Sequence, residues 1–254
     1  MVAVSMRYLL FGVLSVLGSV TGLQATSTLT DGSEQIVTVV TSSRADSLGT
    51  LRRFERSGNG EWHAVGAPVP VLLGKNGMAW GRGIHPAQPG EQKREGDEKT
   101  PAGLFRLGLI LGDAAEPPSG TRAPYVRKTE RTAWIGHSGL SDGARYNHLY
   151  VLPEGTVPPA WWEKEMMKPD TPAHELMVLI EHNYPDSVAD AGSAIFFHIQ
   201  RSPVRRSAGC TVMPREAIEE LIAWLDPKKK PLLAELPRPD YQTRRTAWGL
   251  PPLE

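Results

Sequence analysis

Short apolar runs separated by polar turns dominate the hydrophobic pattern of the chain, and they predict a mainly β protein. Residues 35–41 (QIVTVVT) are rich in β-branched side chains, which favour strands. Residues 49–56 and 61–65 flank Asn59-Gly60, a pair that favours the tight turn of a β-hairpin. Further short apolar segments that suit strands lie at 68–73, 103–111, 133–135 and 150–152.

Two other segments are continuously apolar, at 176–181 (LMVLIE) and 193–199 (SAIFFHI). Their length suits strands that are buried on both faces, although a buried helix gives the same pattern. Helical periodicity is clearest at 214–225 (PREAIEELIAWL). Proline comes first there, glutamates follow near the first turn, and apolar residues recur at the spacing of one helix face. A shorter helix is predicted at 158–167.

The segments between these elements are predicted to be irregular. Several glycines over 73–85 indicate a loop or a bulged edge, and residues 86–98 are polar enough for a surface loop. Residues 116–169 carry no motif that we can interpret. We expect one domain over 26–241, whose main helix follows the cysteine at 210, and a loosely ordered tail over 242–254.

The N-terminus has the pattern of a secretory signal peptide, which we place at residues 1–25. Arg7 precedes an apolar run, and Ala25 offers a small residue at the cleavage point. The alternative is a membrane anchor, but the apolar run is only about 13 residues, short of the roughly 20 that span a bilayer. No cysteine lies near the exit of this segment, which argues against a lipid anchor there.

The overall composition excludes some classes of protein. Hydrophobic residues make up 40% of the chain, enough for a packed core and more than a disordered chain carries. Lysine and arginine number 28, and so do aspartate and glutamate. Because nucleic-acid binding usually needs a basic excess, this balance argues against a nucleic-acid partner.

Cys210 is the only cysteine in the sequence. Cysteines of exported proteins usually pair in disulfides, so a single one indicates an intermolecular link or a reactive thiol. The alternative is a buried cysteine that serves as a small hydrophobic residue. Composition alone leaves these interpretations open, and the surrounding sequence favours the reactive thiol.

His198 ends an apolar run and lies 12 residues before Cys210, so the intervening loop can fold back and bring both side chains together. An adjacent imidazole can accept the thiol proton and lower the thiol pKa by forming an ion pair. Gly209 permits close approach of a substrate carbonyl to backbone N–H groups near Cys210, which could form an oxyanion hole. Three arginines of the loop would favour a thiolate and a substrate carboxylate: Arg201, Arg205 and Arg206.

Each of these residues also has a simpler interpretation. His198 could be a core histidine, and the arginines could belong to an ordinary solvated loop. A zinc site with His182 as third ligand is a further alternative, but no compact ligand motif links His182 to His198 and Cys210. We therefore expect neither a metal nor another cofactor.

Ser207-Ala208-Gly209-Cys210, with a histidine upstream at the end of an apolar run, resembles the active-site motif of the YkuD-type L,D-transpeptidases. Independently, the segment 99–105 (KTPAGLF) resembles the Thr-Pro-x-Gly-x-Phe segment of the same family. The resemblance extends over roughly residues 35–241. It implies a YkuD-like β-barrel or sandwich with a few helices, in an enzyme of the periplasm or bacterial cell envelope.

The resemblance also implies roles for individual residues. Cys210 would attack the third residue of a peptidoglycan stem peptide, release the terminal D-alanine and pass the resulting thioester to an amine, with His198 as the general base. The Ile199 carbonyl would orient the imidazole, and Ser207 and Gly209 would lie at the oxyanion and substrate. Peptidoglycan stem peptides are the expected partners, and membrane contact is expected only through an uncleaved signal.

The sequence departs from the common pattern of the family at two positions. Ala208 and Val212 stand where relatives often carry charged side chains. We assign the missing cationic role to Arg201 or Arg206 as a hypothesis. Two alternative functions stay open at this point: an L,D-carboxypeptidase or hydrolase with the same nucleophile, and a non-catalytic domain that binds the cell wall.

Overall fold

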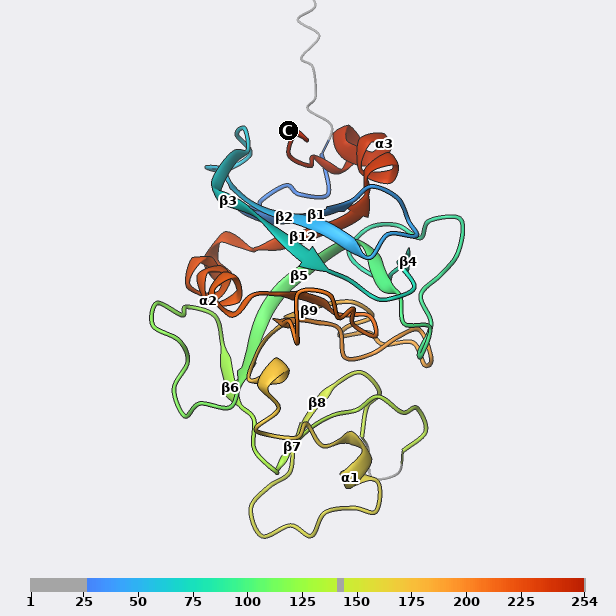
Figure 1. Cartoon of the computed structure of the whole chain (residues 1–254), viewed down its shortest axis with the longest axis vertical. Coiled ribbons are helices and arrows are strands. Elements are labelled where there is room, and N and C mark those ends of the chain that lie inside the picture. The colour runs from blue at the N-terminus through green and yellow to red at the C-terminus, as the bar shows by residue number, and fades with distance from the viewer. Residues whose placement is uncertain (1–26, 141–143, 254) are drawn as a thin grey trace, which may run out of the picture.

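A computed structural model describes residues 27–140 and 144–253 of the chain (Figure 1). The predicted signal peptide at 1–25 lies outside these residues. Within them, no helix combines the length and the apolar character that crossing a bilayer requires.

Eight of the described strands form a closed ring, which confirms the mainly β prediction. The order around the ring is β12-β1-β2-β3-β11-β10-β9-β5, and β5 pairs with β12 to close it. The bounds are β1 Gln35–Thr41, β2 Leu48–Glu55, β3 His63–Leu72, β5 Thr100–Gly112, β9 Leu176–Ile180, β10 Phe196–Ile199, β11 Thr211–Met213 and β12 Leu232–Pro237. Two neighbouring pairs are parallel, β1 with β12 and β10 with β11.

The predicted hairpin is confirmed, since β2 and β3 pair as antiparallel neighbours. The glycine-rich segment 73–85 is more regular than predicted, because it includes β4 (Met78–Trp80), which runs parallel to β5. Its glycines allow close packing: a Cβ at Gly83 would lie 2.1 Å from the Leu104 carbonyl oxygen. The strand was missed because it is only three residues long.

The centre of the ring is filled by large apolar side chains from opposite strands, and helix α2 (Arg215–Trp224) covers part of the ring through Ile218, Leu221 and Ile222. This helix matches the periodic segment predicted to follow Cys210, with Pro214 just outside its first turn. Only Pro214 joins β11 to α2, which holds β11 against the core.

A separate lobe lies below the ring in Figure 1, between β5 and β9. The chain first forms β6 (Tyr125–Arg127), which pairs with β5, and the lobe then contains β7 (Thr132–Trp134), β8 (Leu149–Val151), α1 (Trp162–Glu165) and the 3-10 helix η1 (Pro172–His174). We call residues 113–175 the insert. It has an apolar cluster of its own, formed by Ala133, Ile135, Leu152, Trp161 and Trp162. Of the helix predicted over 158–167, only the single turn of α1 is helical.

The prediction of a loosely ordered tail over 242–254 is wrong for residues 242–253, which the structure describes. Residues Arg238–Trp248 form helix α3, which ends at Gly249 in the left-handed conformation. Trp248 and Leu250 are each only 5% exposed. The polar surface of this helix concealed it, because it buries little more than Tyr241 and Trp248 along its length.

Candidate active site

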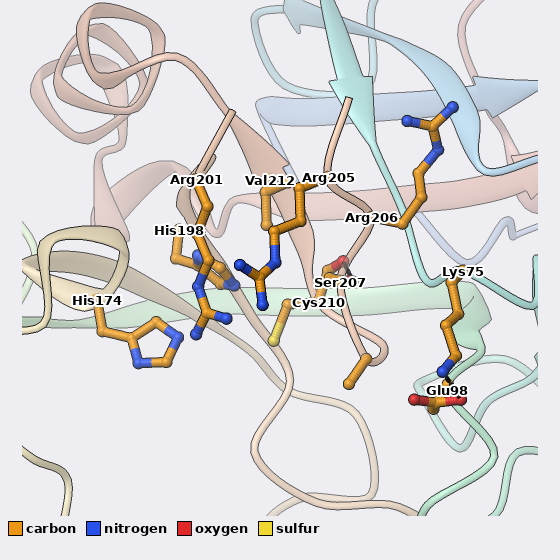
Figure 2. Close-up of a pocket in the computed structure, with 11 residues that line it drawn as sticks. Lys75, Glu98, His174, His198, Arg201, Arg205, Arg206, Ser207, Cys210 and Val212 are labelled. Atoms are coloured by element: carbon orange, nitrogen blue, oxygen red, sulfur yellow. Dashed lines mark hydrogen bonds and ion pairs between the residues drawn. The ribbon is translucent and has the colours of Figure 1, made fainter. Parts of the chain in front are cut away.

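The pairing of β10 with β11 brings the two predicted catalytic side chains to one face of the sheet. His198 lies opposite Val212 in these parallel strands. Cys210 precedes Val212 by two residues, so its side chain points to the same face. Both side chains line a cavity of about 480 Å³ (Figure 2).

The Cys210 side chain is half-buried, and its Sγ–H donates a hydrogen bond of 3.4 Å to the Ala194 carbonyl. Burial raises the pKa of the thiol to about 11, although the positive charges of Lys93 and Arg201 act in the opposite direction. The resting side chain is therefore a neutral thiol. This differs from the ion pair expected from the sequence, because removal from water outweighs the nearby cations.

His198 is held in one tautomer by backbone carbonyls. Its Nδ1 lies 2.9 Å from the Ile199 oxygen and 3.1 Å from the Ala173 oxygen, so Nδ1 carries the proton and Nε2 is left as the acceptor. Burial lowers the pKa of His198, which keeps the imidazole neutral. A neutral imidazole with an unprotonated Nε2 is the form that can take a proton from a thiol.

His174 adds a second imidazole, which no feature of the sequence indicated. Its ring packs edge-on against His198 with 4.8 Å between ring centroids. Burial, together with the positive charges of Arg201 and Lys128, lowers the pKa of His174 to about 4. His174 comes from η1 in the insert, where no motif marks it, and it narrows the cavity beside the reacting pair.

The two sequence motifs meet at the turn that precedes Cys210. Thr100 Oγ1 donates to the Gly209 carbonyl (2.9 Å), and Ser207 Oγ donates to the Cys210 carbonyl (2.5 Å). Gly209 has a φ of +145°, and a Cβ there would lie 3.1 Å from the Lys99 carbonyl oxygen. Glycine is thus needed because the segment 99–105 packs directly behind the nucleophile.

The predicted oxyanion donors differ in their availability. The Gly209 N–H already donates to Ser207 Oγ at 3.0 Å. None of the hydrogen bonds that this turn makes with other described residues uses the Cys210 N–H as a donor. Cys210 itself is therefore the better placed backbone donor for an oxyanion in the cavity.

The arginines of the loop divide into two groups. Figure 2 shows the guanidinium groups of Arg201 and Arg205 directed toward the space beside His198 and Cys210. Arg206 points away from Cys210, since its Nε donates to Ser47 Oγ (2.7 Å) and its NH1 to the Val204 carbonyl (2.7 Å). Of the two cations assigned by hypothesis, the structure brings only Arg201 to the cysteine.

A second cavity of about 530 Å³ opens between the insert and the ring. It shares His174, His198, Arg201 and Cys210 with the first cavity. Its apolar wall consists of Trp134, Met166, Met167, Met177 and Phe196. Cys210 therefore lies where the arginine-lined cavity meets a second cavity that has one apolar wall.

Buried charged groups lie behind the cysteine, and the sequence did not single them out. The Lys93 ammonium, from a segment expected to be a surface loop, is bonded to Asp97 Oδ1 at 2.5 Å. Glu235 of β12 is fully buried, accepts a hydrogen bond from Thr211 Oγ1 (2.5 Å), and has its Oε2 without a partner among the described residues. Burial raises the pKa of Glu235 to about 8.

The structure does not join His182 to the Cys210–His198 pair as a metal ligand. One ring nitrogen of His182 accepts from the Arg82 N–H (3.1 Å), and the other lies 3.0 Å from the Ala191 oxygen. In the part of the chain that the structure describes, no group of three or more suitable side chains could hold a metal ion.

Comparison with known proteins gives one match. The model of the YkuD family, described as the L,D-transpeptidase catalytic domain, matches residues 56–233. This range includes the segment 99–105, both side chains of the Cys210–His198 pair and the whole insert. No curated protein and no solved structure matches the chain.

Proposed function

Because the chain belongs to the YkuD family of L,D-transpeptidase catalytic domains, we propose that Cys210 forms a thioester with a peptidoglycan stem peptide and passes it to an amine. The observation that carries this proposal is the shared cavity, in which a thiol and a neutral, fixed imidazole lie on one face of two parallel strands. A nucleophile beside an oriented base is the arrangement that acyl transfer requires.

In the first half of the proposed reaction, His198 Nε2 takes the thiol proton as Sγ attacks the carbonyl carbon of the third stem residue. The tetrahedral intermediate places its oxyanion near the Cys210 N–H. When the C–N bond breaks, the terminal D-alanine leaves with the proton returned by His198. A thioester at Cys210 and a neutral imidazole result.

In the second half, an acceptor amine attacks the thioester carbon and gives a proton to His198 Nε2. The C–S bond breaks, Cys210 Sγ takes that proton back, and a new amide bond is released. Two cavities meeting at Cys210 support transfer to an amine, because they provide room for a donor on one side and an acceptor on the other. Arg201 and Arg205 supply positive charge for a stem-peptide carboxylate.

We further propose that the protein acts in the bacterial cell envelope, reached through the signal peptide at 1–25. This location follows from the substrate, because peptidoglycan lies outside the cytoplasmic membrane. Mass measurement of the mature protein recovered from the envelope tests it. A mature chain that begins near residue 26 is expected, and recovery of the uncleaved chain from the cytoplasm would contradict export.

The experiment that tests the function uses mass spectrometry of stem-peptide products. Wild-type protein incubated with disaccharide-tetrapeptides should lose D-alanine and give cross-linked dimers, whereas tripeptides alone would show that water resolves the thioester. Arg206→Ala is the matched control, since Arg206 lies in the same loop but points away from Cys210. It should retain activity that Cys210→Ser abolishes.

Acylation by a carbapenem distinguishes an enzyme from a non-catalytic domain, and the assay does not require the natural stem peptide to be known. The β-lactam carbonyl should acylate Cys210 once per chain, and the mass increase should be absent in Cys210→Ser and strongly reduced in His198→Gln. A wild-type protein that gains no mass and converts no stem peptide would indicate a domain that only binds the cell wall.

A further inference from the structure

One side chain of the insert is bonded to the segment that holds the nucleophile. Asn147 lies between β7 and β8 and is 2% exposed. Its Oδ1 accepts hydrogen bonds from Trp134 Nε1 (2.9 Å) and from the Ala194 N–H (3.0 Å). Its Nδ2 donates to the carbonyls of His182 (2.9 Å) and Asn183 (2.7 Å). The hydrogen-bonding capacity of this amide is fully used.

Ala194 connects Asn147 to Cys210. Its N–H is bonded to Asn147, and its carbonyl accepts the hydrogen bond from Cys210 Sγ. Ala194 has a φ of +54°, a left-handed conformation that residues with a side chain rarely adopt. Such a conformation persists only where its surroundings impose it, and the Asn147 side chain provides the bond that fixes this residue.

We propose that Asn147 is a positioning residue for the nucleophile: it fixes Ala194, whose carbonyl holds the Cys210 thiol in place beside His198. The proposal rests on the role of Cys210 given above. It also explains how the insert influences the site, because Asn147 belongs to the insert whereas Ala194 and Cys210 belong to the ring.

The residue type is specific to this task. The side chain must accept from Ala194 and, on its other side, donate to two carbonyls, which an amide does and a carboxylate or hydroxyl does not. The backbone of Asn147 is itself left-handed, with a φ of +56°, and asparagine tolerates this conformation better than most residues. A glycine at position 147 would keep the backbone and remove only the amide.

Loss of the amide has a defined effect on the thiol. The Ala194 carbonyl accepts a hydrogen bond from the neutral S–H, which favours the protonated form. When Ala194 is released, this preference is lost and the pKa of Cys210 should fall. The charged and titratable groups around Cys210 remain as in the wild type; they are Lys93, Asp97, His174, His182, His198, Arg201, Arg205 and Glu235.

The test measures alkylation of Cys210 by iodoacetamide as a function of pH, in the full chain. Because Cys210 is the only cysteine, the reaction reports on this site alone. Asn147→Gly should lower the apparent thiol pKa by up to about one unit, the worth of one lost hydrogen bond, while slowing acylation by a carbapenem about tenfold, since the sulfur is no longer held beside His198. The melting temperature is recorded for each variant to identify a fold that is generally loosened.

Asn183→Gly is the matched control. Asn183 is equally buried and left-handed, with a φ of +52°, but its side chain bonds Val188 and Gly192 instead of Ala194. It should leave the thiol pKa near that of the wild type. An unchanged pKa in Asn147→Gly, or equal shifts in both variants, would overturn the proposal.

Asn147→Asp keeps the inference testable if the glycine variant does not fold. A carboxylate still accepts from Ala194 and adds negative charge, so the thiol pKa should stay at or above the wild-type value, and a lower value would contradict the proposal. The alkylation comparison is independent of substrate. If neither stem peptides nor carbapenems react with the wild type, the proposed function is wrong. The alkylation comparison still shows whether Asn147 positions the Cys210 thiol.

Discussion

At the scale of single residues, the reacting pair consists of two neutral groups in the resting protein. Burial raises the pKa of Cys210 and lowers that of His198, so neither is charged near neutral pH. Under the proposed function, thiolate formation has to accompany attack on the substrate. This arrangement keeps an unpaired thiol poorly nucleophilic until a substrate and the base act together.

The pH dependence of acylation follows from these two shifts. Acylation by a carbapenem needs an unprotonated His198, so its rate should rise with pH through a midpoint below the ordinary histidine value and then stay level. In the absence of substrate, iodoacetamide should report a thiol that titrates at about 11. A thiol that titrates below pH 7 would instead indicate a resting ion pair.

Glu235 gives a second prediction at this scale, for stability. Its folded-state pKa of about 8 exceeds the ordinary value of 4.5, so the folded state binds this proton more tightly than the unfolded state does. The stabilisation is complete below pH 4.5 and is lost as the pH rises to 8, a loss of about 3 kcal/mol at pH 7.

Urea unfolding at several pH values measures this effect. Glu235→Gln keeps the shape and the contact with Thr211 but removes the ionisation, so it should gain stability relative to the wild type between pH 5 and pH 8. Glu220→Gln is the control, because Glu220 lies at the surface in an ion pair with Arg53. Parallel curves for the wild type and Glu235→Gln would show that Glu235 does not titrate in this range.

The sequence could identify residues that act through local motifs. Cys210, His198 and Gly209 were predicted from local motifs, and the structure places the Ile199 carbonyl oxygen 2.9 Å from His198 Nδ1. His174, Lys93 and Glu235 could not be found in this way. They reach the site from three distant segments, and only the closed ring brings those segments together.

At the scale of elements, strands marked by β-branched runs and turn residues were predictable, whereas α3 was not. A helix with a polar surface shows no apolar stripe; Pro237 precedes this helix and Pro239 lies in its first turn. Trp248 is what anchors it, because the indole is 5% exposed and stacks on His85 with 5.1 Å between ring centroids.

Removing this anchor should destabilise the whole ring. Trp248→Ala deletes a buried aromatic side chain and should lower the free energy of unfolding by about 3–5 kcal/mol. Gln242→Ala, at an exposed position of the same helix, should change it by less than about 0.5 kcal/mol. Denaturant unfolding compares them, and a small effect of Trp248→Ala would mean that α3 is only loosely attached.

At the scale of the whole molecule, two adjacent residues of the insert attach it to different segments of the rest of the chain. Asn147 bonds the strand β10 segment, and the neighbouring Tyr146 donates from its hydroxyl to Glu95 Oε2 at 2.5 Å. Glu95 lies in the segment that also contributes Lys93.

Loss of the tyrosine attachment should loosen the insert but not the ring. Tyr146→Phe removes a hydrogen bond to a carboxylate, worth about 1.5–3 kcal/mol. Amide exchange in β7 and β8 should become at least about tenfold faster, with β1 and β12 unchanged. Tyr150→Phe is the control, since the Tyr150 ring packs on Trp161 and its hydroxyl has no bond among the described residues. Equal acceleration in both variants would exclude a role for the Tyr146 hydroxyl.

The closure of the ring has a consequence for biosynthesis. β12 comes last among the strands, yet it pairs with both β1 and β5, so that Ile36 lies beside Leu232. As the chain leaves the ribosome, the early strands therefore keep open edges, and contacts of this sequence separation form slowly. Translation passes Cys210 well before β12 is made. A chain that ends before β12 thus carries Cys210 without the strand that closes the ring.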